Sequence, residues 1–261
     1  MRLAWLTDIH LDQVTDLEVR WLAARARAVS DACVITGDIS NAAKLSDDLL
    51  MFARHYEGTV HFVLGNHDYY GSTFLTVNER MVELDRRTRM TWLERSSPVV
   101  LTEETELCGI GGWYDAEYGH GMQSQVQLND FAAIYDLKMA CLARRLYSKL
   151  RALAKAAADD AEAQLRRTRA REVIFATHVP PFPENSVYAG KQSDDHFLPY
   201  FTSKAMGDML LRVAASLPHQ RFTVLCGHSH GRATHQPLPN LVCHTGAAEY
   251  GSPEVERVFE V

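Results

Sequence analysis

Short apolar runs alternate along the chain with segments whose apolar residues recur every three or four positions. The apolar runs predict buried strands and cover 2–6, 32–36, 60–64, 172–176 and 221–225. The segments of helical period cover 16–29, 46–56, 76–90 and 203–217, with Ser46 as an expected N-cap. Strands that alternate with helices in this way predict an α/β fold.

The middle of the chain has a different pattern. Runs at 99–101 and 106–112 predict a hairpin, and an aromatic, polar loop follows at 113–120. From 128 to 171 the composition shifts to Ala, Arg and Leu at helical spacing, which predicts a long amphipathic helix or a pair of helices. A straight helix of roughly 35 residues would be about 50 Å long, so we expect either a turn near Asp159-Asp160 or a projecting helix. Runs at 240–245 and 254–261 predict closing strands.

The composition is that of an ordinary globular protein. A chain of 261 residues with 46% hydrophobic side chains can form one large α/β domain or two small ones. Its five cysteines show no CxxC spacing, so a reducing cytoplasm is the simpler location. The apolar run at the N-terminus is too short for an export signal, and no apolar segment reaches 18 residues. We therefore expect neither export nor a membrane span.

The charge is acidic overall but uneven. A formal net charge of −6 argues against a protein that coats nucleic acid. Residues 134–172 are an exception, because they carry ten Lys and Arg against five Asp and Glu. This basic stretch is interpreted either as a solvated helix face or as a docking surface for an anionic substrate or a partner.

Polar clusters follow five of the predicted strands at the point where each strand ends. They are Asp8-Ile9-His10, Gly37-Asp38, Gly65-Asn66-His67-Asp68, His178 and Gly227-His228-Ser229-His230. Ligands of open α/β sheets bind beyond the carboxyl ends of the strands, so these clusters are expected to converge. Any one of them could be a helix cap or a packed polar group. Capping and packing alone do not account for five clusters in phase with five strands.

In this order, the motifs D-x-H, G-D, G-N-H-D, an isolated His and G-H-x-H resemble those of the calcineurin-like metallophosphoesterase superfamily. The resemblance spans most of the chain and implies a four-layer αββα sandwich, in which two mixed sheets are flanked by helices. It also implies a dinuclear metal centre at one edge of the sandwich. We expect a single domain over residues 1–261 with a helical insertion at about 124–171, where substrate choice could lie.

The resemblance also implies roles for individual residues. One metal would be held by Asp8, His10, Asp38 and His230, and the other by Asp38, Asn66, His178 and His228. Asp38 would bridge the two ions, which such a carboxylate keeps about 3.5 to 4 Å apart. Metal binding can lower the pKa of water from 15.7 towards roughly 7, so a metal-bound hydroxide could attack phosphorus. His67 would assist the leaving group and Asp68 would hold its imidazole; alternatively, His67 is a structural support.

The donor set indicates the class of metal. His, carboxylate and amide ligands suit two divalent or mixed-valence transition metal ions, chosen among Mn, Fe, Zn, Co and Ni, with Mn or Fe favoured. Cys ligands are absent from the set, which argues against a closed structural zinc site. Aromatic or polar residues that could line a substrate pocket, or simply pack, are Tyr69, Trp113, Tyr114, Tyr118, His120 and His196. The remaining histidines, His55, His61, His219, His235 and His244, are interpreted as structural or exposed.

The sequence therefore predicts metal-dependent hydrolysis of a phosphoric ester, with a small phosphoester as the partner. The core motifs do not separate a phosphatase from a phosphodiesterase. A nuclease is possible but not favoured, because the chain is acidic and shows no obvious second DNA-binding domain. A non-catalytic scaffold for protein interactions is the alternative from a different class, but such a protein would be expected to have lost ligands. The sequence gives no indication of the oligomeric state.

Overall fold

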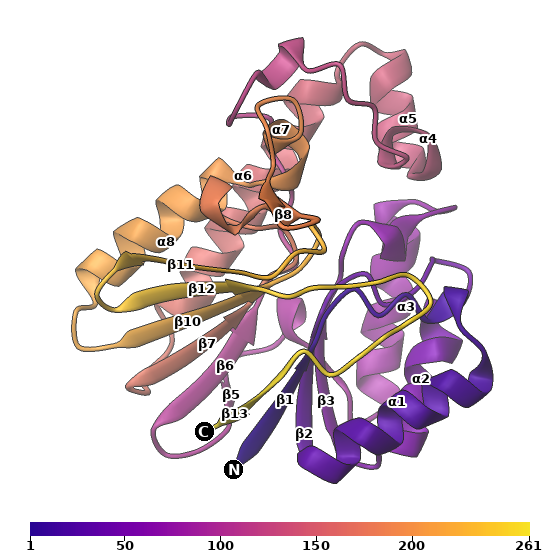
Figure 1. Cartoon of the computed structure of the whole chain (residues 1–261), viewed down its shortest axis with the longest axis vertical. Helices are drawn as coiled ribbons and strands as arrows, with labels where there is room; N and C mark the ends of the chain where they lie inside the picture. Colours follow the sequence, from indigo (N-terminus) through magenta and orange to yellow (C-terminus); the bar gives the residue numbers. More distant parts are fainter.

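The computed structural model describes residues 1–261, which form four layers: helices, two sheets face to face, and helices again (Figure 1). The predicted α/β sandwich of two mixed sheets flanked by helices is confirmed. In Figure 1 the two termini lie side by side at the end of the sandwich opposite α4 (Asp130–Ala133), α5 (Tyr135–Leu142) and α7 (Leu198–Phe201).

The first sheet has the strand order β13-β1-β2-β3-β4. Strands β1 to β4 are parallel, whereas β13 is antiparallel to β1. Its strands are β1 (Arg2–Leu6), β2 (Ala32–Thr36), β3 (Thr59–Val63), β4 (Thr91–Trp92) and β13 (Arg257–Glu260). Helices α1 (Asp16–Val29), α2 (Leu45–Tyr56) and α3 (Phe74–Arg87) cover its outer face. Because both faces are covered, the central strand β2 is buried at every position and does not alternate with exposed residues.

The second sheet has the order β11-β12-β10-β7-β6-β5. Its four central strands are parallel and the two edge strands are antiparallel. The strands are β5 (Val99–Val100), β6 (Thr105–Gly109), β7 (Glu172–Ala176), β10 (Arg221–Cys226), β11 (Ala233–Leu238) and β12 (Leu241–Thr245). Helices α6 (Leu146–Leu165) and α8 (Lys204–Ser216) pack on its outer face.

Three apolar cores hold the layers together. The largest lies between the first sheet and helices α1 to α3 and extends beneath the insertion. A second joins the other sheet to α6 and α8. The third lies between the sheets and is built from side chains such as Trp5, Val34 and Ile174. This inter-sheet core fixes the two sheets face to face, so the carboxyl ends of their parallel strands meet at one edge.

Most predicted elements are confirmed within one or two residues, but four strands, three of them only two residues long, were not predicted. They are β4, β11 and the hairpin of β8 (Val187–Tyr188) with β9 (Lys191–Gln192). Two-residue strands carry too little periodicity to be recognised, and β11 lies at a sheet edge where its side chains are only partly buried. The predicted cap of α2 is also wrong, because Lys44 holds the N-cap position without a side-chain bond. The side-chain oxygen of Asn41 instead accepts hydrogen bonds from the N–H groups of Ala43 and Lys44.

The long helical stretch is broken into three helices, but not where the sequence indicated. They are α4 (Asp130–Ala133), α5 (Tyr135–Leu142) and α6, and the turn falls at residues 143–145. Arg144 adopts a left-handed conformation there, with φ of 54°. The expected break at Asp159-Asp160 is wrong, because both residues lie within α6 on its exposed side, where Lys155 pairs with Asp159. Their charges are solvated and do not interrupt the helix.

The remaining elements are short. They are α7 (Leu198–Phe201) and five 3-10 turns at Leu11–Gln13, His67–Tyr69, Leu93–Arg95, Gly121–Gln123 and Pro183–Asn185. None of the helices combines the length and the apolar character needed to cross a membrane.

Candidate metal centre

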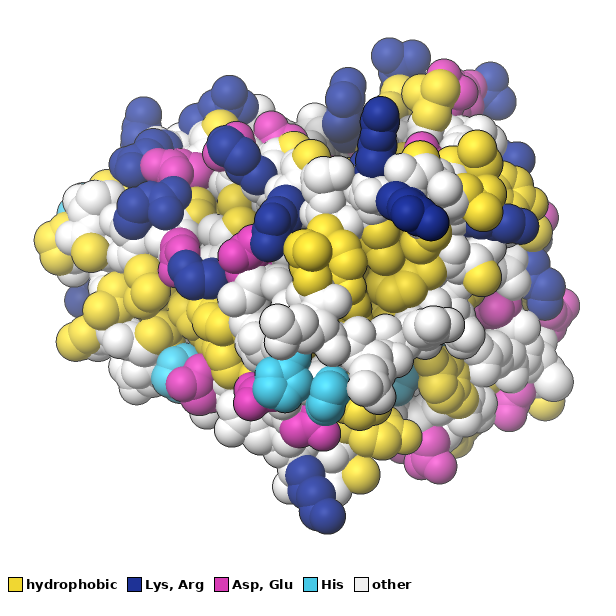
Figure 2. Space-filling view, turned by 90° about the horizontal axis from the view of Figure 1, so that it is seen from above, with side chains coloured by type: hydrophobic (Ala, Val, Ile, Leu, Met, Phe, Trp, Pro, Cys, Tyr) yellow, Lys and Arg dark blue, Asp and Glu magenta, His cyan; other side chains and the backbone are white.

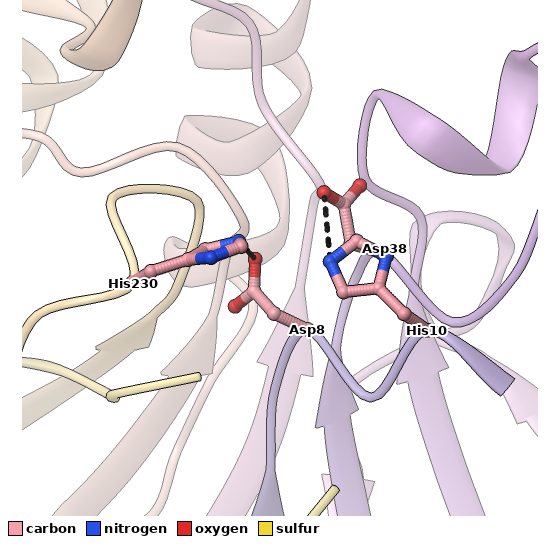
Figure 3. A group of neighbouring side chains, drawn as sticks. All are labelled: Asp8, His10, Asp38 and His230. Carbon is pink, nitrogen blue, oxygen red and sulfur yellow. Dashed lines mark ion pairs between the residues drawn. The ribbon is translucent and has the colours of Figure 1, made fainter. Parts of the chain in front are cut away.

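Four predicted ligands form a first group above the ends of β1, β2 and β10 (Figure 3). Asp8 and His10 follow β1, Asp38 follows β2 and His230 follows β10, and their ligand atoms lie within 4.8 Å of one another. His230 Nε2 lies 3.4 Å from Asp8 Oδ1, and His10 Nε2 lies 4.0 Å from Asp38 Oδ2. The His10 ring is buried, and neither of its nitrogens has a hydrogen-bond partner. A buried unpaired imidazole is costly, and a metal ion in this group would satisfy it.

A second group shares Asp38 with the first and adds His178, after β7, and His228, after β10. His178 Nε2 lies 3.3 Å from Asp38 Oδ1 and 3.0 Å from the side-chain oxygen of Asn66. The two oxygens of Asp38 therefore face different groups, Oδ1 towards His178 and Oδ2 towards His10. This is the arrangement that a carboxylate shared between two cations requires.

Backbone carbonyls orient the imidazoles of the second group. His178 Nδ1 lies 2.9 Å from the carbonyl oxygen of Thr36, and His228 Nε2 lies 2.9 Å from that of Tyr200. A carbonyl only accepts, so these nitrogens carry the proton and the other nitrogen of each ring presents a lone pair to the site. Burial is the main factor that lowers the pKa of His228 to about 4, so its imidazole is neutral at pH 7.

The two carboxylates at the centre remain ionised. Burial by itself would raise the pKa of Asp8, but the hydrogen bond from His230 and the neighbouring imidazoles hold it well below its ordinary value. Burial likewise opposes ionisation of Asp38, and the neighbouring imidazoles, first His178, keep its pKa below the ordinary value. Buried anionic carboxylates beside neutral imidazole lone pairs form a donor set that fits a transition metal ion.

The loops that carry the ligands have unusual backbone conformations. Nine non-glycine residues have positive φ, and five of them are predicted ligands, with φ from 37° to 67°: Asp8, His10, Asp38, His228 and His230. Such residues cost on the order of 1–3 kcal/mol each and accumulate at functional sites. The backbone also approaches closely here, because any side chain at Gly65 would collide with the Asp38 carboxylate. Bonds from backbone N–H groups to the ligands, such as His228 N to Asp8 Oδ1 at 2.9 Å, hold these loops in place.

Asp130, at the start of α4, was not identified from the sequence. It is 2% exposed and accepts hydrogen bonds from Asn66 Nδ2 at 3.0 Å and from the hydroxyls of Tyr70 and Tyr114. It lies 64 positions after Asn66, within the helical insertion. No local sequence signal distinguishes it from the other acidic residues of the insertion.

Asp68 is placed differently from its predicted role. Its carboxylate accepts the backbone N–H groups of Ile39, Ser40 and Gly65 at 2.8–2.9 Å, and no hydrogen bond joins it to His67. The two residues share a 3-10 turn, where successive side chains point about 120° apart. Asp68 is therefore turned into the protein, where it ties the loop after β2 to the loop after β3. It does not orient the His67 imidazole.

His67 projects from the same turn towards the open side of the site. Its side chain is 21% exposed, and its Nε2 lies 3.9 Å from Asp38 Oδ2. The ring stacks on Tyr70 with centroids 4.2 Å apart and contacts His10 edge-on at 4.8 Å. Stacking therefore positions this imidazole beside the candidate metal ligands.

A cleft of about 400 Å³ opens above these side chains. Predicted site residues Asp38, Asn66, His67, His228 and His230 form its floor. Its walls are Tyr70, Leu128, Asn129, Asp130, Tyr188, Ser193, Phe197, Phe201, Ser229 and Tyr250. No Lys or Arg lines it, and its volume is within the range of small-molecule sites.

None of the six residues considered from the sequence as pocket-lining candidates lines this cleft. Tyr69 and Trp113 line a separate groove beside α3, and Tyr114 is fully buried behind His228. His120 and His196 pack against each other with centroids 4.6 Å apart. The aromatic walls instead come from Tyr70, the loops at 188–201 and Tyr250, because these segments fold back over the strand ends.

Two solved structures share this fold at low sequence identity. A phosphopantetheinyl hydrolase from Mycobacterium tuberculosis is 13% identical, with a TM-score of 0.63 over 95% of this chain and 89% of that one. A dimetal phosphatase from Danio rerio is 14% identical, with a TM-score of 0.54 over 98% and 88% of the two chains. At this identity they show the shared fold alone.

The sequence itself provides the family assignment. No curated protein matches it significantly. Residues 1–232 match the family model described as calcineurin-like phosphoesterase, which spans every ligand position described above. This chain therefore belongs to the calcineurin-like phosphoesterase family.

Proposed function

We propose that this protein hydrolyses a phosphoric ester at a dinuclear centre of divalent or mixed-valence ions, with Mn or Fe favoured. The observation that carries the proposal is the position of Asp38, whose two carboxylate oxygens face two separate ligand groups. The first ion would be held by Asp8, His10, Asp38 and His230. The second would be held by Asp38, Asn66, His178 and His228.

The residues around this centre have separate roles in the proposed hydrolysis. When bound, the ions supply an activated water and offset negative charge on the phosphate. His67 reaches into the cleft with no hydrogen bond to its ring, so it is placed to give a proton to the leaving oxygen. Asp68 acts on this step only indirectly, because it fixes the turn that carries His67.

Within phosphoric esters, we favour a small diester with an aromatic or apolar substituent. A monoester carries up to two negative charges, whereas a diester carries one, and the cleft offers no Lys or Arg to balance a second charge. Tyr70, Tyr250 and Phe201 instead offer ring faces and edges to a planar or apolar group. The volume of about 400 Å³ suits a compact ligand.

Nucleic acid is the less favoured substrate. A polynucleotide needs a continuous basic track for its backbone. Figure 2 shows Lys and Arg side chains spread over the upper face in separate groups, with apolar and acidic side chains between them. Several basic residues of α6 are also neutralised by acidic neighbours, such as Lys155 by Asp159 and Arg151 by Glu117.

The test is a hydrolysis panel on protein reconstituted with Mn, Fe, Co, Ni or Zn. It includes phosphomonoesters, aryl diesters, cyclic nucleotides, oligonucleotides and a phosphopantetheinyl ester, the last because a structural neighbour is named for that group. We expect aryl or cyclic diesters to be cleaved fastest. Asp38→Ala removes the shared ligand and should abolish turnover and binding of at least one ion. Absence of turnover with every metal, or full activity in Asp38→Ala, would contradict the proposed function.

A further inference from the structure

The amide of Asn66 can face the site in two ways, and a group outside the family motifs decides between them. Its carboxamide lies between His178 Nε2 on one side and the Asp130 carboxylate on the other, at 3.0 Å from each. A carboxylate only accepts hydrogen bonds. Asn66 must therefore turn its NH₂ group to Asp130 and its oxygen to His178.

This orientation leaves two acceptors facing each other inside the site. His178 donates through Nδ1 to Thr36, so its Nε2 presents a lone pair to the oxygen of Asn66 when the imidazole is neutral. Two lone pairs at 3.0 Å repel unless a cation lies beside both. If the amide were reversed, its NH₂ group would bond to His178 and no oxygen would face the site.

We propose that Asp130 is a positioning residue that presents the oxygen of Asn66 to the second metal, so the helical insertion completes the metal centre. This inference rests on the second ion of the proposed function. Asp130 does not need to touch the ion or the substrate for this role. Hydrogen-bond partners of metal ligands commonly tune metal affinity by about 10–100-fold.

Two further groups besides Asn66 donate hydrogen bonds to the Asp130 carboxylate. The hydroxyls of Tyr70 and Tyr114 donate to it at 2.5 and 2.7 Å. Burial, and secondly the charge of Asp130, raises the pKa of both tyrosines above the usual range, so both hydroxyls remain protonated donors. Three donors are therefore directed at the Asp130 carboxylate, and the NH₂ group of Asn66 is one of them.

The insertion is also fixed to the chain that follows the Asn66 turn. Gly71 N donates to the carbonyl of Ala133 at 2.8 Å, and Tyr135 N donates to the carbonyl of Ser72 at 3.0 Å. Asp136 accepts the free N–H of Phe74 at the start of α3. These bonds hold α4 and α5 against residues 71–74, so the position of Asp130 relative to Asn66 is set by backbone contacts on both sides.

The test is a calorimetric Mn²⁺ titration of metal-free full-length protein, with bound metal counted by elemental analysis. We expect wild-type protein to bind two ions. Asp130→Ala should weaken one of the two sites about 10–100-fold and leave the other unchanged. Asp115→Ala is the matched control, because Asp115 is another buried carboxylate and accepts hydrogen bonds from the backbone N–H groups of Glu117 and Ala205, away from the metal ligands. It should lower stability without changing either Mn²⁺ affinity.

A reciprocal exchange separates positioning from general support of the fold. Asn66→Asp alone places two carboxylates against each other and should weaken the second site. The double variant Asn66→Asp/Asp130→Asn restores a donor and an acceptor in the reverse direction and should recover at least tenfold of that loss. Two unaltered Mn²⁺ sites in Asp130→Ala would overturn this inference alone, and so would the absence of recovery in the double variant. Fewer than two ions in wild-type protein would overturn the proposed dinuclear centre, and with it this inference.

Discussion

His67 differs from the ligands His178 and His228 in what holds its ring. His178 and His228 each donate a hydrogen bond from one ring nitrogen to a backbone carbonyl, which leaves the other nitrogen free for a metal. The His67 ring makes no hydrogen bond and is held by stacking on Tyr70. A ring with both nitrogens free can take up and release a proton, whereas a ligand held by a carbonyl and a metal cannot.

This difference predicts a selective defect in His67→Ala. Both metals should still bind, and turnover should fall about 10²–10⁴-fold for esters with poor leaving groups. Esters whose leaving group departs without protonation should be affected much less. The measurement is kcat for a series of aryl diesters of graded leaving-group pKa, together with metal content. Loss of bound metal, or an equal decrease across the series, would show that His67 is a ligand support and not a proton donor.

At the scale of elements, one buried polar side chain adds hydrogen bonds to the apolar packing of α6 on the second sheet. Gln164 is 6% exposed; its side-chain oxygen accepts the N–H of Gly109 in β6, and its NH₂ group donates to the carbonyl of Leu93. The carbonyl of Leu93 has a second donor in Ser96, whereas the N–H of Gly109 depends on Gln164. The basic character of α6 is confined to its exposed side and contributes little to this attachment.

Gln164→Leu keeps the bulk of the side chain but leaves the Gly109 N–H buried and unpaired. We expect a loss of about 1–3 kcal/mol in the free energy of unfolding, measured by urea denaturation. Asp159→Ala, which removes an exposed ion pair from the same helix, should change it by less than about 1 kcal/mol. Equal effects of the two substitutions would mean that the Gln164 bonds do not hold α6 to the sheet.

At the scale of the whole molecule, the inter-sheet core contains a titratable group. His61 lies on the same face of β3 as Val63, which belongs to that core, and is 3% exposed with Nδ1 unpaired. Burial lowers its pKa from 6.5 to about 4. The folded state therefore resists protonation of His61 more than the unfolded state does.

Stability should consequently depend on pH through His61. Its contribution is fully present above pH 6.5 and is lost as the pH falls towards about 4, with a total change of about 3 kcal/mol. His61→Leu should remove this part of the pH dependence. The measurement is urea unfolding of metal-free wild type and variant at pH 7.5 and pH 4.5. An identical loss of stability in both proteins would exclude His61 as a source of the acid sensitivity.

The sequence by itself determined the alternation of strands with helices and nearly all the strand ends at which the site is built. Periodicity reports local backbone structure, and β1, β2, β7 and α1 begin and end where the pattern indicated. The ligand positions could also be predicted from the sequence, because the motifs are short and each follows a strand. These features depend only on residues close together in the chain.

Only the tertiary structure decided which side chains that are far apart in the sequence come into contact. The bond between Asn66 and Asp130, the inward turn of Asp68 and the entry of Tyr250 into the cleft each depend on how loops fold back over the strand ends. No periodicity encodes such pairings, because packing and hydrogen-bond satisfaction across the whole fold select them. The motifs therefore placed the ligands, whereas the tertiary fold determined which way Asn66 faces and what surrounds the substrate.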